Sequence, residues 1–125
     1  SSLVPCDPYE GSLMWQWMSF EQYQLEPGIG TVRLLLKSLK KTPEELGERY
    51  TERFQRGADT LAVLERALTG REWLVGGTPT LADIALFAYT HVAGEAGYRL
   101  ADYPAISVWI ARFKTLPWYA PITEP

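Results

Sequence analysis

Few side chains in this sequence are of types that catalyse reactions. The chain has one cysteine and one histidine. Cys6 could supply a thiolate nucleophile, but no partner base accompanies it and prolines flank it, so we interpret it as a bystander. For His91 we favour a hydrogen-bonded structural imidazole over a general base. Because no Cys/His cluster has metal-ligand spacing, we expect no metal ion here.

Thr80 and Asp83 have the spacing of a helix capping box. The threonine hydroxyl can accept from an amide of the first turn, while the Asp83 carboxylate reaches back to the amide of Thr80. A nearly continuous apolar segment follows, from Leu81 to Tyr89. A helix that is apolar on all sides belongs in a core, where no water satisfies its first amides. We therefore interpret both residues as structural capping residues.

The first helical segment carries more large apolar side chains than one buried face needs. At about 100 degrees per residue, one stripe contains Leu13, Trp17 and Phe20. A second stripe contains Met14, Met18 and Leu25, with Glu21 between the two. One stripe can face the bundle, and we expect the methionine stripe to be partly exposed. Another subunit, a missing domain or an apolar ligand could cover it, although simple core packing remains an alternative.

Hydrophobic periodicity predicts an all-α bundle of about four to five helices. The first runs from about Glu10 to the Leu34–Leu36 region, with a bend or break at Pro27. The second opens at Thr42, and the third runs from Leu81 to about Glu95. The fourth follows Tyr103. The expected core positions of the second are Tyr50, Phe54, Gly57, Leu61, Leu64 and Leu68, and those of the fourth are Ile106, Trp109, Ile110 and Phe113.

The length, the net charge and the cysteine count limit the functions that this chain can have. The 125 residues suit one domain, over residues 1–125. A net charge of -3 leaves no basic stripe for a phosphate backbone, so we expect no nucleic-acid partner. We expect no membrane partner either, because the longest apolar stretch is too short for a span. The single cysteine favours a reducing compartment, and the cytoplasm is the expected location.

The quoted motifs resemble the C-terminal domain of bacterial glutathione S-transferases. The resemblance rests on the run from Trp17 to Arg33, on the capped segment continuing through Ala88–Ala93, and on Asp102–Ile106 with Trp109. It implies an N-terminal thioredoxin-like domain, absent from this chain, that binds glutathione and carries the thiol-activating residue. Glutathione is then a substrate rather than a cofactor, and the intact protein is expected to be a homodimer.

The same resemblance implies that this domain lines the site for an apolar electrophile. The expected co-substrate residues are Met14, Trp17, Met18, Glu21, Trp118 and Tyr119. Gln22 and Arg53 are expected near glutathione. The alternative for Glu21 and Gln22 is a solvated helix face, and the alternative for Arg53 is an ion pair with Glu48 or Glu52. The chain alone is expected to be inactive.

Two other functions fit the same features. The chain could be a non-catalytic interaction module, since similar domains are appended to translation factors and aminoacyl-tRNA synthetases. It could also belong to a redox or dehalogenating member of the superfamily.

Overall fold

A single long helical segment forms one side of the molecule. The computed structural model describes residues 3–121, and this segment comprises α1 (Pro8–Phe20), the π-helix η1 (Glu21–Gly30), α2 (Thr31–Arg33) and the π-helix η2 (Leu34–Ser38). The Asp7 carboxylate caps its start by accepting from the amide of Glu10 at 3.1 Å. Pro27 neither splits nor ends it, because the helix takes up this residue within π-helical turns.

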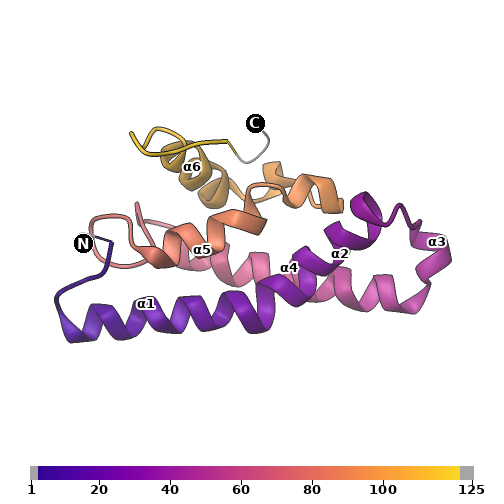
Figure 1. The fold of residues 1–125 in the computed structure, drawn as a ribbon, viewed down its shortest axis with the longest axis horizontal. Coiled ribbons are helices and arrows are strands. Elements are labelled where there is room, and N and C mark those ends of the chain that lie inside the picture. The colour runs from indigo at the N-terminus through magenta and orange to yellow at the C-terminus, as the bar shows by residue number, and fades with distance from the viewer. Residues whose placement is uncertain (1–2, 122–125) are drawn as a thin grey trace.

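The chain then reverses and packs back along this segment (Figure 1). Thr42 caps α3 (Pro43–Leu46), accepting from the amide of Glu45 at 3.2 Å, as its sequence signal predicts. Gly47, at a φ of 58°, separates α3 from the long helix α4 (Glu48–Leu68). The expected core face of α4 is confirmed, with Leu61 and Leu64 fully buried.

Two further helices close the bundle. α5 (Leu81–Thr90) is the capped helix, and it ends five residues earlier than expected: after a turn, a 3-10 helix η3 (Ala93–Ala96) follows. A second 3-10 helix, η4 (Leu100–Asp102), leads to α6 (Pro104–Phe113). α6 buries all four residues that its periodicity predicts, which are Ile106, Trp109, Ile110 and Phe113. No strand occurs within residues 3–121, so the all-α fold class is confirmed.

One contact that joins α6 to α4 is absent from the sequence expectations. The carboxylate of Glu65 in α4 accepts from the amides of Ala105 and Ile106, at 2.8 and 2.9 Å. The first amides of a helix have no partner within the helix, so a carboxylate from a neighbouring helix can cap them. Glu65 is not among the core positions that the periodicity predicts for this helix, and the structure makes it the cap of α6.

Candidate functional site

The predicted capping box is present and does more than cap α5. The Asp83 carboxylate accepts from the amide of Thr80 at 2.9 Å, and the Thr80 hydroxyl accepts from the amide of Ala82 at 3.2 Å. The same carboxylate also accepts from the amide of Leu74 at 3.1 Å and from the indole N–H of Trp109 at 2.9 Å. Asp83 thus ties α5 to the segment before it and to α6.

Burial raises the pKa of the Asp83 carboxyl, although its hydrogen bonds to Thr80, Trp109 and Leu74 act in the opposite direction. A buried group with a shifted pKa often marks a reactive site. Here the acceptor oxygens are already engaged by three protein donors, and Asp83 is fully buried. The geometry supports the structural interpretation.

Three of the candidate residues line a hollow where α1 meets η1. The hollow has a volume of about 360 Å³, and Met18, Glu21 and Gln22 lie in its wall with Ala85 of α5. The Glu21 side chain is buried, and its carboxylate accepts from the side-chain amide of Gln22 at 2.5 Å. The hollow therefore combines an apolar wall with one carboxylate–amide pair.

Trp118 and Tyr119 lie in a second hollow, which α5 also borders. This hollow has a volume of about 310 Å³, and its wall includes Phe87, His91 and Phe113. The rings of Phe87 and Phe113 stack at 3.9 Å, and Tyr119 lies edge-on to Phe87 at 5.8 Å. The wall of the second hollow is thus mostly aromatic, with Ile84, Ala88 and Ala120 completing it.

His91 forms part of the wall of this second hollow. Its Nδ1 lies 2.8 Å from the carbonyl oxygen of Phe87, so this nitrogen carries the hydrogen. The imidazole also stacks on Phe87 at 4.3 Å. Glu95, four residues further on, is held instead by Arg33 and Lys37. The structural interpretation of His91 is supported by these contacts.

A single face of α5 joins the two hollows. Ala85 lines the first hollow, and Ile84 and Ala88 line the second. At about 100 degrees per residue, these three positions lie within about 100 degrees of one another, and Phe87, which also lines the second hollow, widens the span to about 160 degrees. Five candidate residues line the two hollows beside α5: Met18, Glu21, Gln22, Trp118 and Tyr119.

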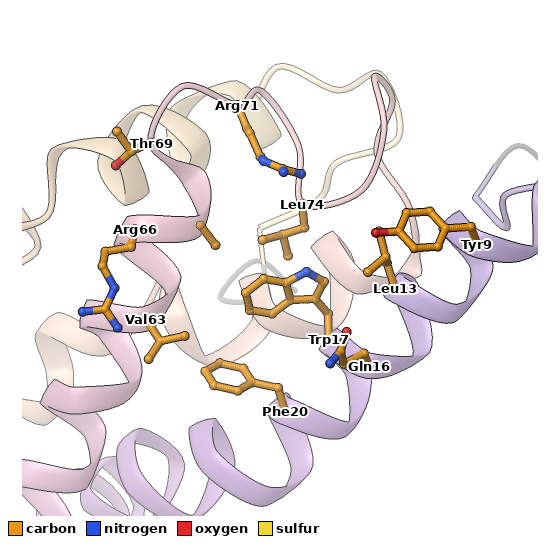
Figure 2. A pocket seen from close by; sticks show the side chains of 11 residues that line it. Tyr9, Leu13, Gln16, Trp17, Phe20, Val63, Arg66, Thr69, Arg71 and Leu74 are labelled. Atoms are coloured by element: carbon orange, nitrogen blue, oxygen red, sulfur yellow. The ribbon is translucent and has the colours of Figure 1, made fainter.

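Trp17 faces elsewhere, into a larger cavity of about 520 Å³ between α1 and α4. Figure 2 shows its indole at the centre, with Phe20 beside it and Leu74 opposite. The rings of Trp17 and Phe20 pack edge-on at 5.3 Å. Arg66 and Arg71 also line this cavity, and its lining contains no carboxylate.

The expectation for the methionine stripe was wrong at two of its three positions. Met14 and Leu25 are fully buried in the core. Met18 is only partly buried. The stripe that remains half-exposed is the other one, formed by Leu13, Trp17 and Phe20. Periodicity separated the two stripes, but it could not show which of them faces the core.

A family model decides the relationship of this chain to known proteins. The model of the glutathione S-transferase C-terminal domain matches residues 25–117. The chain belongs to this family. The sequence resemblance is thereby confirmed, and the hollows around α5 can be read as parts of a transferase C-terminal domain.

Solved glutathione S-transferases share the whole fold of this transferase domain. The enzyme from Xanthobacter autotrophicus Py2 is 39% identical, with a TM-score of 0.94, over 98% of this chain and 60% of its own. The one from Pseudomonas fluorescens Pf-5 is also 39% identical, with a TM-score of 0.94, over 99% of this chain and 61% of its own. The chain thus spans about three fifths of these relatives.

One curated relative is named as a reductase. Glutathionyl-hydroquinone reductase PcpF of Sphingobium chlorophenolicum is 43% identical over 83 residues, which cover 59% of this chain and 26% of the reductase.

The transferase domain holds Arg53 in a way that neither sequence interpretation anticipated. Its guanidinium donates to the carbonyl oxygen of Pro27 at 3.1 Å. Within residues 3–121, no ion pair joins it to Glu48 or Glu52. Helix periodicity along α4 could not reveal this contact, because it depends on how closely η1 approaches.

The remaining features add no reactive centre within the described part of the transferase domain. Cys6 is exposed. Residues 3–121 contain no group of three or more His, Cys, Asp or Glu side chains suited to hold a metal ion. None of the helices described is at once long and apolar enough to cross a bilayer.

Proposed function

We propose that this chain is the C-terminal domain of an enzyme that conjugates glutathione to an apolar electrophile, and that the face of α5 binds the electrophile. The observation that carries this proposal is the pair of hollows on that face. Ligand sites are mostly apolar concavities with a few polar groups that fix orientation. The aromatic hollow supplies the apolar wall, and the Glu21–Gln22 pair supplies the polar groups.

In this proposal the domain orients the electrophile and takes no part in covalent chemistry. Met18, Trp118 and Tyr119 supply apolar contact area, while Glu21 and Gln22 line the polar end. Holding the electrophile beside the glutathione thiolate raises its effective concentration there. Met14 has no place in this site, because it is fully buried in the core.

Steady-state kinetics of the intact protein test this site. Met18→Ala and Tyr119→Ala should each raise KM for 1-chloro-2,4-dinitrobenzene by about tenfold, the effect of about 1.4 kcal/mol of lost apolar contact. KM for glutathione should change less than about twofold. Val108→Ala is the matched control, since Val108 is 55% exposed on α6 and lines neither hollow. Unchanged electrophile KM in both variants would exclude this face.

We further propose that the cavity holding Trp17 is a contact surface between two subunits. The support for this proposal is the half-exposed stripe of Leu13, Trp17 and Phe20. Tyr9 and Val63 line the same cavity and are 71% and 37% exposed. Aromatic and arginine side chains are enriched at protein interfaces, and this cavity has both. Sedimentation of the intact protein tests it: Val63→Asp should shift the dimer towards monomer, whereas Val108→Asp should not.

A second candidate reaction is glutathione-dependent reduction, which the 43% identity to a glutathionyl-hydroquinone reductase favours. Assaying the intact protein with both a glutathionyl-hydroquinone and an aryl halide separates the two reactions. Turnover of the first substrate alone would assign the redox function. Absence of both activities, together with no glutathione binding, would favour the interaction module.

A further inference from the structure

The π-helix η1 carries Glu21 and Gln22 but is an uncommon structure for ten successive residues. Proline has no amide hydrogen, so the helix also loses an internal hydrogen bond at Pro27. Such a segment persists only where its surroundings determine its geometry. Contacts from neighbouring residues must therefore hold η1 in this geometry.

Two arginines of α4 bind the backbone of η1. Arg56 donates to the carbonyl of Tyr23 at 2.7 Å, and Arg53 donates to that of Pro27 at 3.1 Å. Thr60 lies beside them, but its hydroxyl donates to the Arg56 carbonyl of its own helix at 2.8 Å and is 3.4 Å from the carbonyl of Gln24. Both arginine donors are charged, which strengthens a hydrogen bond; Arg53 is partly buried and Arg56 is exposed.

The spacing of these side chains matches one face of α4. Positions 53, 56 and 60 recur at intervals of three and four residues, and Gly57 lies among them. An added Cβ on Gly28 would lie 2.9 Å from the Gly57 backbone, so η1 and α4 are in backbone contact there. The glycines allow the close approach, and the flanking side chains then reach the carbonyls of η1.

From this geometry we propose that Arg56, assisted by Arg53, is a positioning residue for the electrophile site. It holds the Tyr23 carbonyl and thereby the π-helical turn that orients Gln22 and Glu21 towards α5. It touches no substrate itself. The proposal rests on the proposed function, because it assigns a role in the site at the face of α5.

The test compares Arg56→Ala with Arg49→Ala in the intact protein. Arg49 is the matched control because it is, like Arg56, an exposed arginine of the same helix, whereas the hydrogen bonds to η1 carbonyls come from Arg53 and Arg56. Hydrogen exchange of the amides in residues 24–31 should be about tenfold faster in Arg56→Ala and unchanged in Arg49→Ala. Arg56→Lys should restore part of the protection, since lysine keeps a charged donor. Equal exchange in Arg56→Ala and wild type would overturn the proposal.

A kinetic cycle with Gln22 separates positioning from simple stabilisation. Arg56→Ala and Gln22→Ala should each lower kcat/KM for the electrophile by about tenfold, while the double variant should lose about as much as either alone. Multiplicative losses, near a hundredfold, would show that Arg56 does not act through Gln22 and would overturn the inference. Failure of the proposed function is recognised differently, by Met18→Ala and Tyr119→Ala leaving the electrophile KM unchanged.

Discussion

Asp83 shows how one side chain can serve three parts of a fold. A carboxylate has about four acceptor positions, and here amide and indole donors from Thr80, Leu74 and Trp109 fill three of them. The residue is fully buried, so none of these donors has water as an alternative partner. Its contribution to stability should therefore exceed that of an ordinary helix cap.

Removing this carboxylate should be costly. Asp83→Ala leaves up to three buried donors unpaired, and each such donor costs about 1–3 kcal/mol. The expected loss is therefore about 3 kcal/mol or more, against about 1 kcal/mol for Thr80→Ala. Urea unfolding of the variants measures both losses. Asp102→Ala, at an exposed carboxylate, is the control; an Asp83→Ala loss no greater than this control would show that the three hydrogen bonds contribute nothing.

The raised pKa of Asp83 predicts that its contribution to the free energy of unfolding falls as pH rises. The folded state holds the proton more tightly than the unfolded state, in which the pKa is about 3.9. The stability from protonated Asp83 is therefore present at low pH and is lost as pH rises through the folded pKa. As pH rises from the unfolded pKa to the folded pKa, the difference in unfolding free energy between wild type and Asp83→Asn should therefore shrink. A difference that grows with pH would contradict the raised pKa.

Glu95 provides a control of opposite sign for this experiment. Hydrogen bonds from Lys37 and Arg33 lower the pKa of its carboxyl. The stability that it adds is present above the unfolded pKa and is lost as pH falls through the folded pKa. The difference between wild type and Glu95→Gln should therefore shrink towards low pH.

At the scale of elements, the crossing of η1 and α4 depends on two glycines. A Cβ on Gly28 would meet the Gly57 backbone at 2.9 Å, and one on Gly57 would lie 2.0 Å from the Tyr98 hydroxyl oxygen. Tyr98 itself is fixed, since its ring stacks on Phe54 at 4.2 Å and its hydroxyl donates to the Phe54 carbonyl at 3.0 Å. Neither neighbour of an added methyl group is free to move.

Replacing a glycine by alanine should therefore destabilise the domain at this crossing but not at an open position of a helix. Gly28→Ala should destabilise the domain by about 1–3 kcal/mol, the usual cost of overpacking, because backbone atoms cannot yield. Gly11→Ala in α1 should stabilise it by about 0.5–1 kcal/mol, because alanine favours helix and the nearest atom, the Pro5 oxygen, lies 4.0 Å away. Urea midpoints measure both changes. Similar shifts at both sites would mean that the crossing is not tightly packed.

For the molecule as a whole, the sequence predicted local features better than contacts between helices. The capping box and the buried face of α6 follow from motifs and periodicity, and the structure confirms both. The assignment of Met14 to an exposed stripe failed, because helical spacing gives relative directions on a helix without saying which direction is inward. The roles of Glu65 and Arg56 were likewise invisible, since each depends on backbone groups of another helix.

The final prediction concerns the activity of the chain by itself. The family resemblance places the thiol-activating residue in a thioredoxin-like domain, and within this domain the Asp83 carboxylate is already engaged by three donors. Purified residues 1–125 should therefore not accelerate conjugation of glutathione to 1-chloro-2,4-dinitrobenzene above the uncatalysed rate, whereas the intact protein should. Turnover by the fragment that survives repurification and disappears in Cys6→Ala would show that the exposed thiol of this domain is itself reactive, and the division of labour between two domains would then be wrong.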